Sequence, residues 1–167
     1  MGNLSLYLLR HARTLDKEGF QPDKERELST VGLQNATRMG IYLSNDDTCF
    51  DYIVASSAIR TVQTAHLVAE QLKHDTDKVF QNDEIYEASV RTLLKVVNNF
   101  KDEWKKVLLV GHNPSISYLA EYITGSEVGD LTTCGLVQLS FKKMKWSEVS
   151  ENTGAFESYV YPDLLNF

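Results

Sequence analysis

This 167-residue sequence lacks the features of exported, membrane-spanning and nucleic-acid-binding proteins. Its two cysteines are too few for the disulfide framework of a small secreted domain, and no apolar run approaches the roughly 18 residues of a membrane span. A secretory signal would need a basic N-terminal segment followed by an apolar one, and none is evident. A formal net charge of −6 is opposite to that of a general nucleic-acid binder. We therefore expect a cytoplasmic protein with reduced cysteines, and neither a nucleic acid nor a membrane as its partner.

Breaks in composition are also scarce. Three prolines and nine glycines are scattered along the chain, and no linker, repeat or low-complexity tract divides it. Hydrophobic residues make up 43% of the sequence and charged residues 24%, which are ordinary values for a globular domain. We predict one domain over residues 1–167.

Strand-like and helix-like segments alternate, which is typical of an α/β fold with a mostly parallel central sheet. Apolar residues recur every three or four positions in two segments that we predict as amphipathic helices. The first set is Leu33, Ala36, Gly40 and Leu43, and the second is Val62, Ala65, Ala69 and Leu72. The predicted strands are 4–10, 51–56 and 107–111, and the predicted helices are 30–44, 58–72, 89–101 and 114–124. Two alternating segments, 136–141 and 156–161, should complete the sheet, antiparallel at an edge.

Two charged motifs directly follow predicted strands. Arg10-His11-Ala12-Arg13 ends the first strand, and Gly111-His112-Asn113-Pro114 follows Val107–Val110. If these strands are parallel neighbours, their carboxyl ends place two histidines and two arginines at the rim where ligands bind in open α/β sheets. Arginine matches phosphate oxygens with its planar fork, and a neutral imidazole can attack phosphorus. The motifs therefore predict a phosphate pocket.

The residues around His112 should begin a helix. Asn113 is a suitable N-cap, and Pro114 suits the first turn, where its missing N–H does no harm. His112 would then precede free backbone N–H groups and a positive dipole, which favours a neutral imidazole and helps to hold an anion.

A third motif, Ser57-Ala58-Ile59-Arg60 followed by Gln63-Thr64-Ala65, comes after the predicted strand 51–56. With Ser57 as N-cap, Arg60 is the third helical residue, where a cation opposes the helix dipole at a cost of about 0.3–1 kcal/mol. A bound anion would reverse the sign of that interaction. The alternative is a surface arginine whose stem covers apolar neighbours. Before it, the polar, aperiodic segment 13–28 is expected to be a loop over the rim, with Ser29 or Thr30 as N-cap of the next helix.

The three motifs, in this order, resemble the histidine phosphatase superfamily. Within it, the short chain and the sequences of Leu8–Ala12 and Gly111–Pro114 most resemble the SixA-type phosphohistidine phosphatases. The resemblance covers residues 4–162. It implies a three-layer α/β/α sandwich of the phosphoglycerate mutase type. It also implies that His11 is a nucleophile that becomes phosphohistidine, that Arg10 and Arg60 clamp the phosphoryl oxygens, that His112 is a further donor and that Arg13 supports the pocket. Because guanidinium groups can neutralise those oxygens, we expect no metal and no cofactor.

The general acid stays open. Many members of the superfamily use a carboxylate between the second and third motifs, and Asp83, Glu84 and Glu87 are available, of which we single out Glu84 and Glu87. The alternative is that these are solvated charges before a helix. SixA-like enzymes manage without a strong acid, since imidazole leaves more easily than an alkoxide. Ala58, where the family usually has proline, is acceptable in a first helical turn.

Other nucleophiles and ligands are poor candidates. Cys134 lacks the arginine that cysteine phosphatases place six residues later, since Ser140 is there instead. We expect His66 and His74 to lie outside the site. The leading interpretation is a phosphatase for phosphohistidine on a protein such as a histidine-phosphotransfer domain. A small-molecule phosphomonoesterase is the second possibility, and a non-catalytic module that binds phosphorylated partners is the third.

Overall fold

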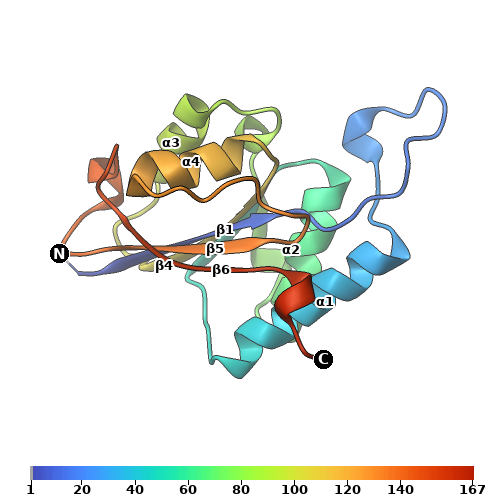
Figure 1. Cartoon of the computed structure of the whole chain (residues 1–167), viewed down its shortest axis with the longest axis horizontal. Coiled ribbons are helices and arrows are strands. Elements are labelled where there is room, and N and C mark those ends of the chain that lie inside the picture. Colours follow the sequence, from blue (N-terminus) through green and yellow to red (C-terminus); the bar gives the residue numbers. More distant parts are fainter. Residues whose placement is uncertain (1) are drawn as a thin grey trace.

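A six-stranded sheet in the order β3-β2-β4-β1-β5-β6 forms the middle of the protein in the computed structural model, which describes residues 2–167 (Figure 1). Neighbouring strands among β3, β2, β4 and β1 are parallel, whereas β5 and β6 are antiparallel additions at one edge. The strands are β1 (Leu4–Arg10), β2 (Tyr52–Ala55), β3 (Val79–Gln81), β4 (Lys106–Gly111), β5 (Leu136–Phe141) and β6 (Ala155–Val160). The predicted α/β class, parallel sheet and antiparallel edge are confirmed.

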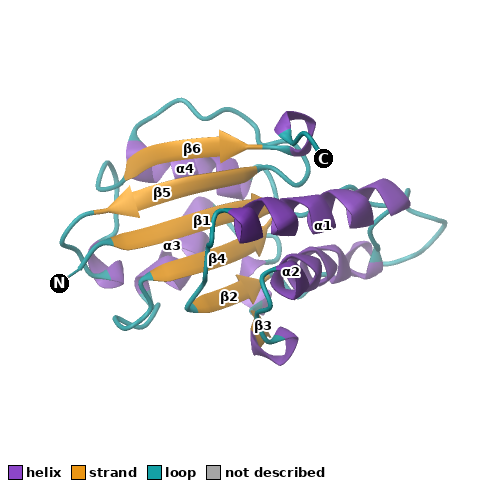
Figure 2. Ribbon diagram, turned by 90° about the horizontal axis from the view of Figure 1, so that it is seen from below, coloured by secondary structure: helices purple, strands orange, loops and turns teal. Residues whose placement is uncertain are grey.

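Within residues 2–167, four α-helices cover the two faces of the sheet and make three layers (Figure 2). The helices are α1 (Thr30–Asn45), α2 (Ile59–Gln71), α3 (Val90–Asn98) and α4 (Ser115–Thr124). In Figure 2 the first two lie in front of the sheet and the last two behind it. The arrangement is the expected three-layer α/β/α sandwich.

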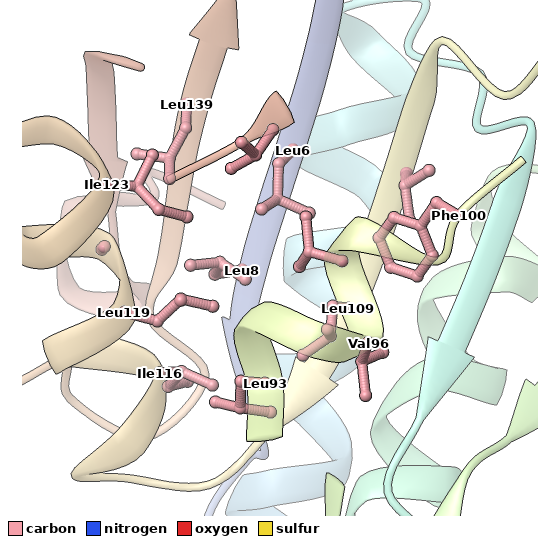
Figure 3. Packing of buried hydrophobic residues seen from close by; sticks show 14 of the residues in the cluster. Leu6, Leu8, Leu93, Val96, Phe100, Leu109, Ile116, Leu119, Ile123 and Leu139 are labelled. Atoms are coloured by element: carbon pink, nitrogen blue, oxygen red, sulfur yellow. The ribbon is translucent and has the colours of Figure 1, made fainter. Parts of the chain in front are cut away.

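Successive residues of the central strands point to opposite faces, so each strand feeds two cores. On the α3 and α4 side, Leu8 of β1 and Leu109 of β4 pack with Leu93 and Leu119 (Figure 3). On the other side, the next residue of β1, Leu9, belongs to the cluster that α1 and α2 close. Burial of one leucine side chain contributes about 1.5–3 kcal/mol to folding stability. The alternating leucines therefore stabilise β1 and β4 from both faces of the sheet.

Three details of the predicted elements were wrong. Leu33 is 40% exposed, because the buried face of α1 runs through Ala36, Met39 and Leu43 instead. Strand β3 was not predicted, because it has three residues of which only Val79 is buried, too few to show a period. Helix α3 ends at Asn98 rather than at residue 101, although the buried Phe100 continues its apolar pattern.

Candidate active site

The two histidine motifs meet at one rim of the sheet because β1 and β4 are adjacent and in register. Arg10 pairs with Gly111, so the chain leaves both strands at the same level. The next residues, His11 and His112, have ring centroids 5.4 Å apart. The parallel pairing of two strands thus brings together motifs a hundred residues apart in the sequence.

A cavity of about 550 Å³ opens at this rim. All four residues predicted to do the chemistry line it, and so do the expected supporting residue and one of the two candidate acids. These residues are Arg10, His11, Arg60, His112, Arg13 and Glu87. The cavity walls come from the end of β1 and the loop after it, from Arg60 of α2, and from the segments before α3, after β4 and before β5. This is the carboxyl edge of the parallel strands, where ligands are expected.

The imidazole of His11 has one nitrogen engaged by the backbone. Its Nδ1 lies 2.8 Å from the carbonyl oxygen of Ala12. Since a carbonyl only accepts hydrogen bonds, this contact assigns the proton to Nδ1 and leaves the lone pair on Nε2. Burial, followed by the charges of Arg60 and Arg10, lowers the pKa of His11 to about 4, against the opposing effect of the Ala12 bond. The ring is therefore neutral at pH 7, as a nucleophile must be.

The guanidinium of Arg10 has one nitrogen that is hydrogen-bonded to the backbone and one that has no hydrogen-bond partner. Its Nη1 donates to the carbonyl oxygen of Leu131 at 2.8 Å, whereas its Nε is buried without a hydrogen-bond partner. An unpaired buried donor on a cation is costly unless an acceptor arrives. Arg10 also lines the cavity, so its positive charge can act on an anion bound there.

Arg60 and His112 contact each other in the cavity wall. Arg60 is 7% exposed, and its Nη2 lies 3.4 Å from Nδ1 of His112. Arginine can only donate, so Nδ1 is the acceptor and the proton sits on Nε2, which lies 2.8 Å from Ser56 Oγ. Burial, with the charge of Arg60 second, lowers the pKa of His112 to about 3. The expected neutral imidazole is present, but burial is its main cause rather than a helix dipole.

Two of the three predicted helix caps were wrong. Ala58 occupies the N-cap position of α2, so Arg60 is its second residue, and the Ser57 hydroxyl instead contacts Asp83. Asn113 does not cap α4, because its amide donates to Leu131 O at 2.8 Å and accepts from the Ser117 hydroxyl. Neither side chain accepts from a backbone N–H at the start of its helix, and Pro114, predicted in the first turn of α4, occupies its N-cap position instead.

The third cap, Ser29, accepts a hydrogen bond from the N–H of Gly32 at 3.1 Å, as predicted. The start of α1 also lies against the loop that follows β1. A Cβ on Gly32 would lie 2.0 Å from the carbonyl oxygen of Arg13. Only a glycine permits this approach. The Arg13 side chain itself is exposed at the edge of the cavity.

Two residues of α2 hold the segments on either side of the loop between β1 and α1. Thr64 Oγ1 accepts from the N–H of Ala12 at 3.0 Å and donates to the carbonyl of Arg60. Gln63 Oε1 accepts from the N–H of Leu28 at 2.8 Å. The Gln-Thr pair of the third motif therefore ties the His11 loop and the Arg60 helix into one unit.

Sequence reasoning missed Asp23, Arg26, Ser56 and Tyr86, all of which contact or line the site. Asp23 accepts from Arg60 at 2.9 Å and from the Tyr86 hydroxyl at 2.8 Å. The Nε of Arg26 is buried without a partner beside the same cavity. The segment 13–28 was expected over the rim, but its many charges gave no reason to select Asp23 or Arg26.

The candidate acids separate by position. Glu87 lines the cavity and has a φ of 52°, in the left-handed region that non-glycine residues rarely adopt. Glu84 is exposed and does not line it. Asp83 is exposed and forms an ion pair with Lys24 at 2.6 Å. Of the three carboxylates, Glu87 alone lines the cavity.

Cys134 supports His11 through its backbone rather than through its thiol. Its N–H donates to the carbonyl of His11 at 3.0 Å, and burial raises the pKa of the thiol to about 12. A thiol held neutral in this way is a poor nucleophile. Among residues 2–167, no group of three His, Cys, Asp or Glu side chains is arranged to hold a metal ion. No helix within the same range has the length and apolar character needed to cross a bilayer.

Fold and site together define a class of protein with a histidine and arginine pocket at the carboxyl edge of an α/β sheet. A sequence model of the histidine phosphatase superfamily (branch 1) matches residues 6–90, and the chain belongs to this superfamily. Among solved structures, the protein histidine phosphatase SixA in complex with tungstate is similar with a TM-score of 0.84 and 19% identity, over 98% of this chain and 100% of that one. A protein from Nakamurella multipartitia named as a phosphohistidine phosphatase SixA has a TM-score of 0.82 and 22% identity, over 97% and 98% of the two chains.

Other similar proteins carry a different activity in their names or none. The uncharacterized protein ML1117 of Mycobacterium leprae (strain TN) is 29% identical over 122 residues, which cover 71% of this chain and 72% of that protein. The structure of a mycobacterial glucosyl-3-phosphoglycerate phosphatase is similar with a TM-score of 0.70 and 16% identity, over 96% and 99% of the chains. The SixA-like character inferred from the motifs is confirmed at the level of fold and family.

Proposed function

We propose that the protein is a metal-independent phosphatase that removes the phosphoryl group from phosphohistidine on another protein, through a covalent phosphohistidine at His11. The observation that carries this proposal is the arrangement of His11 in the cavity. Its Nδ1 is held by the Ala12 carbonyl, so its neutral Nε2 is the available nucleophile, and Arg10 and Arg60 line the same cavity.

The reaction has two displacements at phosphorus. In the first, Nε2 of His11 attacks, the P–N bond of the substrate breaks, and the departing imidazole takes up a proton from water, while His11 keeps its own proton on Nδ1. In the second, water attacks the phosphorus of phospho-His11, inorganic phosphate leaves, and His11 returns to its neutral form. Phosphoryl transfer depends mainly on positioning and on neutralising the equatorial oxygens. Arg10 and Arg60 supply that charge, with Arg13 at the cavity edge.

His112 can donate to a phosphoryl oxygen only through a nitrogen that carries a proton. In the free protein its Nδ1 accepts from Arg60, and its Nε2–H points to Ser56. When an oxygen anion takes over the Arg60 contact, the proton can move to Nδ1. We assign His112 this donor role in the phosphorylated states.

A protein substrate is favoured by the likeness to SixA structures, which extends over nearly the full length of both chains. The leaving imidazole needs little help from an acid, which suits a cavity where Glu87 is the one candidate carboxylate. A histidine-phosphotransfer domain is the partner that this likeness suggests. Both cysteines are free thiols, which suits a cytoplasmic setting.

A turnover comparison tests the proposal. A phosphohistidine-bearing phosphotransfer domain and a panel of alkyl and aryl phosphates are supplied separately, with a chelator present throughout. We expect the phosphoprotein to react with the higher kcat/KM and the chelator to have no effect.

A small-molecule phosphomonoesterase is the second candidate, and the presence of Glu87 in the cavity favours it. A carboxylic acid there could protonate an alkoxide leaving group. An alkyl phosphate with a kcat/KM above about 10⁴ M⁻¹s⁻¹, together with an inert phosphoprotein, would replace the first proposal with this one. A binding module without turnover is disfavoured, since the nucleophile and both clamping arginines are in place.

A further inference from the structure

Asp23 holds the guanidinium of Arg60 from two directions. It lies in a short turn, Asp23–Glu25, within the loop between β1 and α1. Its backbone carbonyl accepts from Arg60 Nη1 at 2.8 Å, and its carboxylate accepts from Arg60 Nη2 at 2.9 Å. Both terminal nitrogens of the arginine are therefore bound to a single residue of another element.

The same carboxylate contacts two further residues of the cavity wall. Its Oδ2 also accepts from the Tyr86 hydroxyl at 2.8 Å, and its Oδ1 lies 3.4 Å from Nη1 of Arg26. Arg26, Arg60 and Tyr86 line the cavity, but Asp23 does not. Asp23 thus joins three lining residues without occupying the space that a phosphoryl group would fill.

We propose that Asp23 is a positioning residue that fixes the Arg60 guanidinium for phosphoryl transfer. This inference rests on the proposed function, in which Arg60 clamps the transferred group. Arginine is a long side chain with several rotatable bonds, and a displacement of about 1 Å in a clamp can cost on the order of a hundredfold in rate. Because Asp23 takes the terminal edge of the fork, the remaining N–H groups of Arg60 are left for the substrate.

The charge of Asp23 also explains how Arg60 is accommodated before substrate binds. Arg60 is nearly buried, and a buried cation without a partner is strongly disfavoured. Burial acts to raise the pKa of Asp23, but hydrogen bonds from Tyr86 and Arg60 outweigh it and lower the pKa to about 2. The carboxylate is therefore charged throughout the range in which the enzyme would be assayed.

A double-mutant cycle tests the coupling between the two residues. Asp23→Asn, Arg60→Ala and the double variant are compared for kcat and KM on p-nitrophenyl phosphate and on the phosphohistidine protein. We expect Asp23→Asn to lower kcat/KM by about 10–100-fold, mostly through kcat. In the Arg60→Ala background the same change should cost less than about threefold, because its target is gone.

Two further measurements separate positioning from a general structural role. Inhibition by orthovanadate, which forms a five-coordinate adduct resembling the transition state, should weaken in Asp23→Asn by the same factor as kcat/KM falls. Glu25→Gln is the matched control, since Glu25 belongs to the same turn, is exposed and does not line the cavity. Its kcat/KM should stay within about twofold of the wild type. Tyr86→Phe should cost less than Asp23→Asn, and an equal loss would transfer the effect to Tyr86.

Several results would overturn the inference. They are a change below twofold in Asp23→Asn, a full additional loss in the Arg60→Ala background, or a loss in Glu25→Gln as large as that in Asp23→Asn. If Asp23→Asn fails to fold, Asp23→Ser is tested in the same cycle. If the wild type hydrolyses p-nitrophenyl phosphate but not the phosphohistidine protein, the proposed substrate is rejected. The double-mutant cycle can then still be measured on p-nitrophenyl phosphate. If the wild type hydrolyses neither, the proposed function fails, and the cycle is read from vanadate dissociation constants by calorimetry.

Discussion

The carbonyl oxygen of Ala12 lies 2.8 Å from Nδ1 of His11, and this contact decides which nitrogen of the histidine can react. Ala12 is itself held by Thr64 of α2, whose hydroxyl accepts the Ala12 N–H. The tautomer of the nucleophile is therefore fixed by backbone that α2 anchors, and the free lone pair is on Nε2.

Removal of the imidazole should abolish turnover without unfolding the protein. His11→Ala is expected to lose more than about a hundredfold in kcat, since alanine cannot form the covalent phosphoryl intermediate. Steady-state kinetics check the loss, and circular dichroism checks the fold. A variant with more than about a hundredth of wild-type activity would exclude His11 as the nucleophile.

Each clamping arginine should matter on the scale of a transition-state donor. Arg10→Ala and Arg60→Ala are expected to lower kcat by about 10²–10³. Arg10→Lys and Arg60→Lys should recover little of it, because lysine cannot form the bidentate contact. Near-normal kinetics in Arg60→Ala would show that the buried Arg60 has a structural role only.

Protonation of the two site histidines should occur well below the ordinary range. Since burial lowers the pKa of His11 to about 4 and of His112 to about 3, both rings should stay neutral in nitrogen-detected NMR spectra down to about pH 5. The His11 spectrum should show the proton on Nδ1. Titration of either ring near pH 6.5 would contradict the buried, cation-flanked environment.

The same shifts predict the sign of a stability change. Between about pH 6.5 and 4 the unfolded chain binds protons at these histidines that the folded protein does not bind. The free energy of unfolding should therefore fall as pH falls through this window, by up to about 1.4 kcal/mol per pH unit for each histidine. Urea denaturation at several pH values measures the slope, which should be smaller in His112→Asn.

Glu87 and Glu84 should behave differently on the two substrate classes. Because Glu87 alone lines the cavity, Glu87→Gln should cost about 10²-fold or more on alkyl phosphates and little on phosphohistidine. Glu84→Gln serves as the matched control on both. An equal loss on alkyl phosphates in the two variants, or no loss in either, would contradict the assignment of Glu87 as the general acid.

Gly32 should tolerate no side chain. An added Cβ would lie 2.0 Å from the Arg13 carbonyl, so Gly32→Ala must displace α1 or the His11 loop. We expect a loss of about 1–3 kcal/mol or more despite the better helix propensity of alanine. Thermal denaturation measures it, with Gly2→Ala as the control whose Cβ meets only ordinary contacts. An unchanged melting temperature would refute the close approach.

The sheet and the main site residues were predictable from sequence because their signals are local. A buried apolar strand that ends in Arg10-His11, and another that ends in Gly111-His112, locate the rim by themselves. Their meeting follows from one assumption, that the two strands are parallel neighbours, and the register of β1 with β4 bears it out.

Residues whose roles depend on long-range contacts were not predictable. Asp23 is one of many charges in a polar loop, and only the folded chain shows that it meets Arg60, 37 positions away. Ser57 and Asn113 look like caps in isolation, but Asp83 and Leu131 compete for their side chains. Local propensities do not include hydrogen bonds to residues far away in the sequence.

Transfer of the phosphoryl group from a labelled phosphohistidine protein to His11 is the most direct test of the central claim. The two proteins are mixed under single-turnover conditions, quenched in alkali and mapped by mass spectrometry and phosphorus NMR. The account predicts a transient, acid-labile and base-stable phosphoryl group on Nε2 of His11 that decays to inorganic phosphate without added metal. Release of phosphate with no such adduct at any time, or an adduct on another residue, would contradict it.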